Sequence, residues 1–306
     1  RSGFNDAERQ FVGAKILEKC DALDGAADGM VQDVAACQAH FSVDADVPTC
    51  ANGTRTGSCL TPAQKTALEN VFAGARNSAG TALYASFPYD PGLSGPGWAA
   101  WKQSNSIMLD PAAMAFTFMT PPKTAAVLAN LAGFALGFDM DHDAPAIFAT
   151  NGTYTQSSWS FMTPPDETNL AALKSRGAKL LGYHGTGDPV FSFNDTRDWY
   201  AQVAQANGGD ASSFARFYPV PGMNHCSGGP AADQFDMLTP LVAWVEQGQA
   251  PAAVVAAARD TTNAVPNADV PASWGAGRTR PLCPYPQVAR YNGSGDLNSA
   301  ASFSCR

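Results

Sequence analysis

The 306-residue sequence has no long apolar run and few basic residues. No segment approaches the roughly 20 apolar residues that a helix needs to cross a bilayer, so we expect no membrane span. The 19 Lys and Arg residues are scattered and outnumbered by 27 Asp and Glu, so no basic patch for nucleic acid is expected. The first ten residues lack the apolar centre of a signal peptide. We therefore expect a globular protein whose partners are neither membranes nor nucleic acids.

Three common chemical motifs are also absent. None of the seven cysteines forms a C-x-x-C pair, so a zinc ribbon or a thioredoxin-type site has no support. The absence of H-E-x-x-H leaves a metal hydrolase built on His142, His184 and Asp188 with little support. No Gly-x-Ser-x-Gly turn is present, and Ser94 in "GLSGPG" is its nearest imitation. Because Ser94 follows no apolar strand, the sequence predicts no nucleophile at that position.

The cysteines that are present group by sequence distance. Three local pairs close modest loops, and one cysteine, Cys226, is left over. Such pairs are typical of structural disulfides and hence of a secreted, periplasmic or cell-surface protein. The alternative is a cytosolic enzyme with seven buried thiols. The predicted pairs are Cys20–Cys37, Cys50–Cys59 and Cys283–Cys305.

The second half of the chain alternates between strands and helices. Short apolar segments predict strands, and amphipathic segments that end at glycines predict helices. This alternation is typical of an α/β fold with a parallel sheet. The predicted order is strand 179–183, helix 195–207, strand 214–220 and helix 235–251.

The first half of the chain predicts helices and irregular segments. Residues 6–20 form an amphipathic helix, and a capping box of Thr61 and Gln64 begins another helix, which ends at Gly74. Residues 86–122 are rich in Pro, Gly and aromatic side chains, which predicts irregular structure.

Two residues with possible catalytic roles follow the predicted strands. Asp188 lies in the loop after the first strand and His225 in the loop after the second. Chemistry in such sheets is found at the carboxyl ends of the strands. An acid followed by a histidine matches the last two members of the order nucleophile, acid, histidine in α/β-hydrolases. The alternative is that each is an ordinary, hydrogen-bonded loop residue.

Five segments of the sequence resemble the tannase and feruloyl esterase family, and together they span essentially the whole chain. The resemblance implies the C-terminal part of an α/β-hydrolase core with a large, mostly helical and irregular lid-domain insertion. We expect residues 1–14 to end the first part of the core, 15–165 to form the lid and 166–306 to complete the core. The segments are "CDALDGAADGMVQD", "YHGTGDPVFS", "VPGMNHCSGGP", "DMLTPLVAWVEQG" and "RTRPLCPYPQVARYNGSGD".

The resemblance implies that Asp188 is the triad acid and His225 the triad base of an ester hydrolase. In this family a cysteine precedes the catalytic serine and forms a disulfide with the cysteine after the histidine. Carried over, Cys226 pairs with a cysteine outside this chain. We therefore expect the nucleophile to lie in a missing N-terminal half of the same hydrolase.

The resemblance also implies a structural calcium site in the lid. The loop "CDALDGAADGM" is rich in oxygen ligands and glycine, which suits a hard cation, although its spacing is not that of an EF-hand. A solvated acidic turn is the alternative. The implied ligands are the side chains of Asp21, Asp24 and Asp28 and the carbonyl groups of Ala26 and Met30.

The resemblance implies aromatic walls for the acid part of an ester, with Trp101, Phe118 and Phe191 as candidates. Family members that cleave a terephthalate monoester hold its carboxylate with a lid arginine, but residues 98–122 contain only Lys102 as a basic residue. We therefore expect a neutral phenolic acid ester of the feruloyl or galloyl type as substrate. The alternatives are a terephthalate monoester hydrolase and a non-catalytic, calcium-stabilised secreted binding module.

Overall fold

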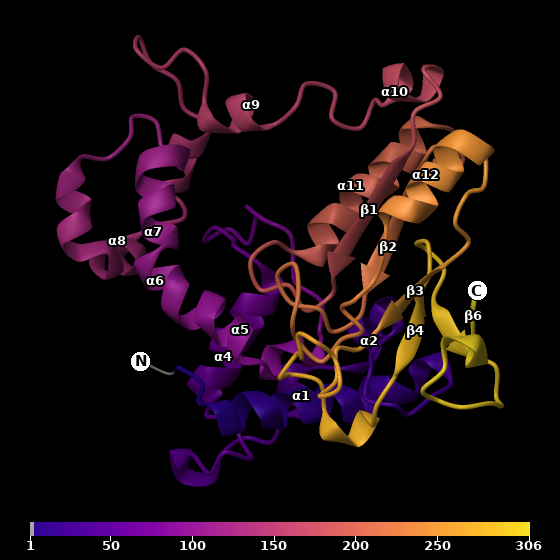
Figure 1. Ribbon diagram of the computed structural model, residues 1–306. Helices are drawn as coiled ribbons and strands as arrows, with labels where there is room; N and C mark the ends of the chain where they lie inside the picture. Colours follow the sequence, from indigo (N-terminus) through magenta and orange to yellow (C-terminus); the bar gives the residue numbers. More distant parts are fainter. Residues whose placement is uncertain (1–2) are drawn as a thin grey trace.

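The computed structural model describes residues 3–306 of the chain. Helices dominate the first 175 residues, and all six strands follow residue 179. Figure 1 shows the first helices along one end of the molecule, an arm of short helices to one side, and the strands beside them. No helix among residues 3–306 is long and apolar enough to cross a membrane.

The N-terminal helices begin where the sequence predicts. A reciprocal capping box of Asn5 and Glu8 starts the first helix, and one of Thr61 and Gln64 starts the fourth, which confirms both predicted boundaries. Gly74 ends the fourth helix with φ 74°. The helices are α1 (Asp6–Cys20), α2 (Val34–His40), α3 (Val43–Asp46) and α4 (Pro62–Ala73).

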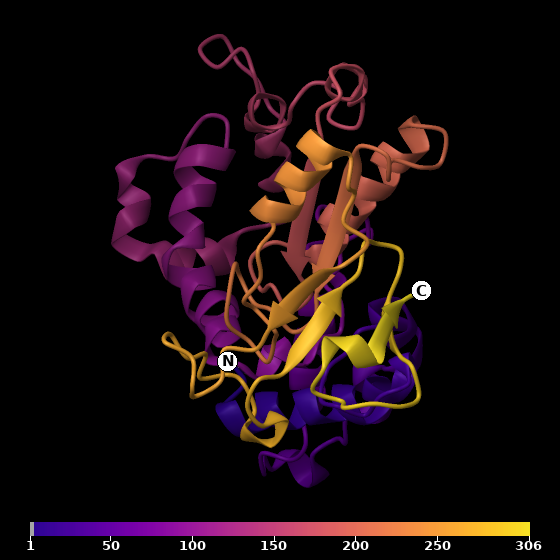
Figure 2. The same cartoon turned by 45° about the vertical axis from the view of Figure 1, so that its right-hand side comes forward.

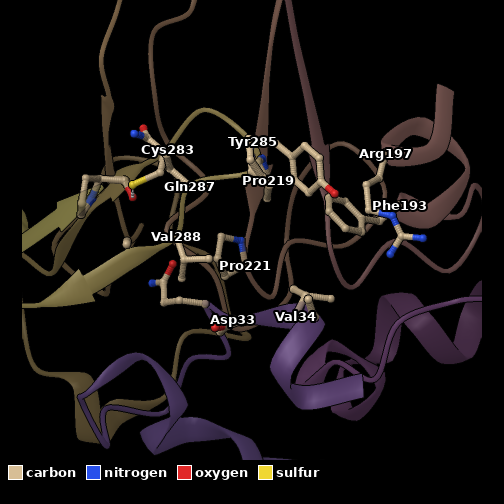
Figure 3. Close-up of a pocket in the computed structure, with 15 residues that line it drawn as sticks. Asp33, Val34, Phe193, Arg197, Pro219, Pro221, Cys283, Tyr285, Gln287 and Val288 are labelled. Carbon is tan, nitrogen blue, oxygen red and sulfur yellow. Dashed lines mark hydrogen bonds between the residues drawn. The ribbon is translucent and has the colours of Figure 1, made fainter. Parts of the chain in front are cut away.

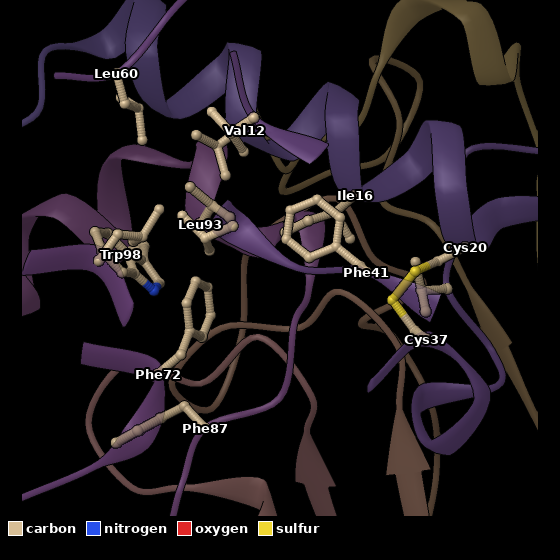
Figure 4. Close-up of a cluster of buried hydrophobic side chains, with 14 residues drawn as sticks. Val12, Ile16, Cys20, Cys37, Phe41, Leu60, Phe72, Phe87, Leu93 and Trp98 are labelled. Atoms are coloured by element: carbon tan, nitrogen blue, oxygen red, sulfur yellow. A yellow bond between two sulfur atoms is a disulfide. The ribbon is translucent and has the colours of Figure 1, made fainter. Parts of the chain in front are cut away.

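These helices enclose a hydrophobic core. Val12 and Ile16 of α1, Leu68 and Phe72 of α4, and Trp98 are all buried in it. In Figure 4 the side chains of Val12, Phe72 and Trp98 point toward one another, with the Cys20–Cys37 disulfide at one end of the cluster. Burying each such side chain contributes about 1.5–3 kcal/mol to folding.

Residues 96–162 form a projecting segment that we call the helical arm. From Pro96 to Phe118 one helical turn follows another, so the prediction of irregular structure over 86–122 is wrong for most of that range. Pro96 and Pro111 occupy first-turn positions, where a missing N–H costs no hydrogen bond. The α-helices of the arm are α5 (Pro96–Ala99), α6 (Ser106–Met108), α7 (Asp110–Ala113), α8 (Leu131–Gly137) and α9 (Ser158–Met162).

A parallel strand pair forms the centre of the second half, as the sequence predicts. After α10 (Ala171–Ser175), strand β1 (Leu180–Gly185) pairs with β2 (Ala215–Val220), and α11 (Phe193–Ala206) connects them. Phe217 of β2 stacks on Phe193 of α11, with ring centroids 5.6 Å apart.

Helix α12 (Leu238–Gln247) lies on the other face of this pair. Arg216, which neighbours Phe217 on β2, contacts Trp244 of α12. Because successive side chains of a strand point to opposite faces, α11 and α12 cover opposite faces, as Figure 2 shows. Trp244 is buried, but Val242 and Val245 are exposed, so the apolar face of this predicted amphipathic helix is only partly buried.

The remaining strands form two antiparallel pairs. Strand β3 (Val254–Ala257) pairs with β4 (Thr279–Leu282), and β5 (Ala289–Tyr291) pairs with β6 (Phe303–Cys305). The segment after β4 joins the central pair through a 2.7 Å hydrogen bond from the Tyr285 N–H to the Phe217 carbonyl.

All three predicted disulfides are present, with Cα–Cα distances between 4.9 and 5.4 Å. They fasten the loop after α1, the loop before α4 and the C-terminal strands. The pairs are Cys20–Cys37, Cys50–Cys59 and Cys283–Cys305.

Candidate active site

Two loops leave the carboxyl ends of β1 and β2 side by side. Gly185 and Val220, the last residues of the strands, lie opposite each other in the parallel register. The loops approach closely, since a Cβ at Gly185 would lie 2.1 Å from the Met223 carbonyl oxygen. Only glycine fits there, which explains the Gly after His184 in the sequence.

Asp188 and His225 meet between these loops. Nδ1 of His225 lies 2.9 Å from Oδ2 of Asp188. The Asp188 side chain is 5% exposed, whereas that of His225 is 29% exposed. The structure therefore brings together the two residues that the sequence predicts as acid and base.

The second oxygen of Asp188 is held by backbone. Oδ1 accepts the N–H groups of Val190 at 2.7 Å and Phe191 at 3.1 Å. Burial by itself raises the pKa of Asp188, but hydrogen bonds from His184, His225 and Val190 bring it below its ordinary value. A carboxylate held ionised in this way can stabilise an imidazolium on His225.

The other ring nitrogen of His225 has no hydrogen-bond partner among residues 3–306. Ser94 does not reach it, because the Ser94 hydroxyl donates to the Pro91 carbonyl at 2.7 Å at the end of a short 3-10 helix, Pro91–Ser94. The prediction that Ser94 is not a nucleophile agrees with this geometry.

Aromatic side chains flank His225. The Trp101 ring lies edge-on, with centroids 5.7 Å apart, and the Phe191 ring is tilted at 5.5 Å. Phe118 ends the π-helical stretch Met114–Phe118 and makes no ring contact with His225 in the described part of the chain. Two of the three predicted substrate residues thus lie beside the imidazole.

Asp90 is a residue of this region that the sequence did not single out. Its buried carboxylate accepts a 2.5 Å hydrogen bond from the Thr186 hydroxyl and a 3.3 Å bond from the Gly222 N–H. Thr186 precedes Asp188 by two residues and Gly222 precedes His225 by three. Burial raises the pKa of Asp90. Asp90 therefore joins the acid loop to the histidine loop.

His184 also faces the pair of Asp188 and His225. Its Nε2 lies 3.3 Å from Oδ2 of Asp188, so one carboxylate oxygen lies near two imidazoles. Its Nδ1 lies 2.7 Å from the Thr196 hydroxyl. This contact depends on strand register and on α11, which no local pattern in the sequence reveals.

Lys102 is a half-buried ammonium group in the helical arm. Its Nζ lies 3.6 Å from the centre of the Phe87 ring, and it forms no ion pair among residues 3–306. Burial lowers the pKa of Lys102 to about 8, although Asp188 and Asp110 oppose the shift. It lines an open cavity of about 690 Å³ together with Tyr84 and Val190.

Cys226, the residue after His225, is exposed and has no disulfide within the described chain. Its φ of 62° lies in the left-handed region, which non-glycine residues seldom adopt.

The predicted metal loop carries three carboxylates. Oδ1 of Asp21 accepts backbone N–H groups from residues 28 to 30, at 3.0 to 3.2 Å. Oδ2 of Asp24 and Oδ1 of Asp28 are buried without a hydrogen-bond partner. Burial first, and then the charges of Asp28 and Asp21, raise the pKa of Asp24 to about 7. Orphaned carboxylate oxygens that repel one another fit a cation.

Across residues 3–306, no three His, Cys, Asp or Glu side chains are placed to hold a metal ion together. A cation in the loop would therefore need backbone carbonyl groups such as those of Ala26 and Met30, both of which are buried. The metal-hydrolase alternative gains no support, since His142 is exposed and lies 3.5 Å from Asp143 rather than beside His184.

A separate cavity of about 130 Å³ lies between α2 and the segment after β4. Figure 3 shows Val34, Pro219 and Tyr285 around it. Neither Asp188 nor His225 lines this cavity.

Relatives of known or proposed activity cover almost all of this chain. Mono(2-hydroxyethyl) terephthalate hydrolase from Piscinibacter sakaiensis is 43% identical over 332 residues, which cover 99% of this chain and 52% of that protein. A probable feruloyl esterase B-2 from Neosartorya fischeri is 27% identical and is covered to 55%. The chain thus spans about half the length of the curated relatives it matches.

Solved structures share the fold. Feruloyl esterase B from Aspergillus oryzae has a TM-score of 0.69 at 24% identity, with 100% of this chain and 57% of that chain covered. Tannin acyl hydrolase from Aspergillus niger has a TM-score of 0.64 at 17% identity, and the match covers 99% of this chain and 54% of that chain. The family model described as "Tannase and feruloyl esterase" matches residues 4–306 of this chain. The chain therefore belongs to the tannase and feruloyl esterase family.

Proposed function

We propose that this chain supplies the acid and the base of a Ser-His-Asp ester hydrolase that acts on small aromatic acid esters. The observation that carries the proposal is the 2.9 Å contact between Asp188 and His225, with Trp101 and Phe191 beside the imidazole. The family and the named activities of the relatives support the reaction type.

In this mechanism the free Nε2 of His225 takes the proton of a serine hydroxyl as the serine attacks the ester carbonyl. The same proton then passes to the leaving alcohol, and the acyl-enzyme is hydrolysed by water in the reverse sense. Asp188 holds the imidazole with Nδ1–H toward its carboxylate and stabilises the imidazolium.

We propose that the serine comes from polypeptide outside residues 1–306, where a cysteine also pairs with Cys226. The exposed Cys226 and the half-length coverage of the relatives support this arrangement. An active-site serine probe tests it. The 306-residue chain alone should not be labelled, and the chain together with its serine-bearing polypeptide should be labelled. Labelling of neither would favour the non-catalytic binding module.

For the substrate we propose a neutral phenolic acid ester of the feruloyl or galloyl type, because no arginine lies within residues 98–122. One observation favours the terephthalate monoester instead. Lys102 has no ion-pair partner in the described part of the chain and lines a cavity beside the loop of Asp188, where an anionic substituent would neutralise it.

Hydrolysis of methyl ferulate, a gallate ester and mono(2-hydroxyethyl) terephthalate separates these substrates. We expect kcat/KM to be highest for one of the first two. A clear preference for the terephthalate ester that is lost in Lys102→Met, with ferulate hydrolysis unchanged, would establish the alternative. Trp159→Ala, on the exposed side of the arm, is the matched control.

We also propose that the Asp21–Met30 loop binds a structural calcium ion, supported by the orphaned oxygens of Asp24 and Asp28. Without calcium, the raised pKa of Asp24, about 7 against an ordinary 3.8, makes its contribution to stability complete below about pH 4. That contribution is lost as the pH rises through 7, and a cation should compensate for the loss.

Thermal unfolding with and without a chelator at pH 5 and pH 8 tests the calcium proposal. Chelation should lower Tm, and more at pH 8 than at pH 5, since the ion binds only the folded loop. Asp24→Asn should remove most of the difference between the two pH values. Equal Tm values with and without chelator at both pH values would contradict a calcium site.

We propose a secreted or periplasmic location, which the three disulfides support. Peptide mapping without reduction should find all three in protein purified from the medium or the periplasm.

A further inference from the structure

His184 is held at both ring nitrogens. It is the fifth residue of β1, and its side chain is 12% exposed. Nε2 lies 3.1 Å from the Phe191 carbonyl oxygen and 3.3 Å from Oδ2 of Asp188, and Nδ1 lies 2.7 Å from the Thr196 hydroxyl. The ring also meets Phe193 edge-on, with centroids 6.3 Å apart. The orientation of this imidazole is therefore fixed by strand, loop and helix together.

These partners determine which nitrogen carries the proton. The Phe191 carbonyl and the Asp188 carboxylate can only accept, so Nε2 must be the donor. The Thr196 hydroxyl can donate to Nδ1, so a neutral imidazole satisfies every contact. The Nε2–H of His184 therefore lies between the Phe191 carbonyl, to which it donates, and the carboxylate of Asp188.

With this donor, both oxygens of Asp188 are fully engaged. Oδ1 accepts two backbone N–H groups, from Val190 and Phe191, and Oδ2 faces the N–H groups of His184 and His225. A carboxylate with donors on both oxygens can neither rotate nor take up a proton without losing a hydrogen bond. Both movements would disturb His225.

We propose that His184 is a positioning residue for the ester hydrolysis proposed above: its Nε2–H fixes the Asp188 carboxylate in the orientation that His225 needs. This inference rests on the proposed function for its kinetic consequence only. The arrangement of the two imidazoles is a property of the 306-residue chain and can be measured without any substrate.

The same donor moderates the pull of Asp188 on His225. Among the hydrogen bonds that lower the pKa of buried Asp188, that of His184 is the largest. Without it the carboxylate becomes more basic and its charge acts on His225 alone, which favours the imidazolium. The pKa of His225 should therefore rise when His184 is removed, and less of the base should be free at a given acidic pH.

Other titrating groups lie near this pair and define the controls. Asp195 on α11 interacts with His184, while Lys102 and Tyr84 interact with Asp188. Lys102, whose pKa is about 8, affects only the alkaline side of a pH profile. The pKa of Asp195 is raised by burial, so Asp195→Asn serves as the control on the acid side.

Three variants test separately the contributions of the Nε2–H donor, the ring shape and the tautomer of His184. His184→Phe keeps a ring against Phe193 but removes the polar contacts of both ring nitrogens. His184→Gln places an amide N–H close to the position of Nε2 and is the conservative rescue. Thr196→Val removes only the partner of Nδ1. His142→Phe changes a histidine whose side chain is 88% exposed and is the matched control.

The first measurement is the pKa of His225 by nitrogen-15 NMR of the 306-residue chain. His184→Phe should raise this pKa by about half a unit or more, Thr196→Val by less, and His184→Gln and His142→Phe by little. The second is the pH dependence of kcat with the serine-bearing polypeptide present. His184→Phe should lower kcat by about 10- to 100-fold with KM nearly unchanged and move the acid limb to higher pH.

An unchanged pKa of His225 in His184→Phe would overturn the proposal, as would a His184→Gln variant no closer to wild type than the phenylalanine variant. If His184→Phe does not fold, the pKa of His225 in His184→Gln and in Thr196→Val, each compared with wild type, tests the same proposal. Failure of the proposed function looks different, because the wild-type chain with its partner polypeptide would then show no turnover while the NMR result stands.

Discussion

Asp188 and His225 stand on loops that packed strands and buried hydrogen bonds hold in place, whereas Trp101 stands on the helical arm, which exposes many of its apolar side chains. In the strand region, Phe217 and Val203 are buried completely or nearly so. In the arm, Phe161 is 75% exposed, and Leu109 and Leu136 are also exposed. The proposed catalytic pair is therefore held by well-buried elements, and the proposed substrate surface lies on an arm that is largely exposed.

The largest difference should come from the catalytic pair itself. His225→Ala removes the general base and Asp188→Asn leaves the imidazole wrongly oriented, so each should lower kcat about 10⁴-fold, on the scale of other triads. Hydrolysis of methyl ferulate with the serine-bearing polypeptide present measures the loss, and circular dichroism should show an unchanged fold. His142→Ala should retain full activity.

The next largest difference should lie in how much buried packing in the strand region and in the arm contributes to the free energy of unfolding. Phe217→Ala in the strand region should lower the free energy of unfolding by about 3–5 kcal/mol, because it leaves a cavity between β2 and α11. Phe161→Ala in the arm should change it by no more than about 0.5 kcal/mol, since the side chain is mostly in solvent. Urea unfolding measures both losses, and equal losses would contradict a difference in packing between the strand region and the arm.

The link between the two loops should have an intermediate effect. Thr186→Val leaves the Asp90 carboxylate with a weaker set of donors, which should cost about 1–3 kcal/mol of unfolding free energy. Because Thr186 also accepts the Gly222 N–H at 2.9 Å, the histidine loop should loosen and kcat should fall with it. Thr186→Ser, which keeps the hydroxyl, is the control and should remain close to wild type.

The smallest effect should lie in the arm. Trp101→Ala removes the ring edge that meets His225 and should lower kcat/KM about tenfold, mainly through KM. Trp159→Ala, also in the arm but 53% exposed, should leave both constants unchanged. Equal effects of the two substitutions would show that the arm acts as a whole rather than through Trp101.

Local patterns predicted the parts of this site that are local. The order of strand, loop and helix put Asp188 and His225 at strand ends, and the capping box of Thr61 and Gln64 marked where α4 begins. The sequence resemblance added the roles of the two residues. Asp90 could not be found in this way, because it lies 96 residues from Thr186, and only the fold brings them together.

The predictions were wrong where composition or periodicity indicated one structure and tertiary packing produced another. Prolines and glycines in 86–122 indicated irregular structure, but Pro96 and Pro111 sit at helix starts, where they are compatible with helix. In α12 the apolar period was correct, yet Trp244 is the only residue of this helix that is buried. Periodicity shows that a helix has an apolar face but does not show what covers it.

The two ends of the chain are tied together, and this bears on the order of folding. The Arg280 guanidinium pairs with Asp28, 252 residues away, and Arg290 donates to Asp33 across 257 residues. Such distant contacts form slowly, because the intervening chain must first be brought into place. The Asp28 and Asp33 carboxylates can pair with these arginines only after the segment that carries Arg280 and Arg290 has been made. The contacts of this acidic loop are thus among the last to form.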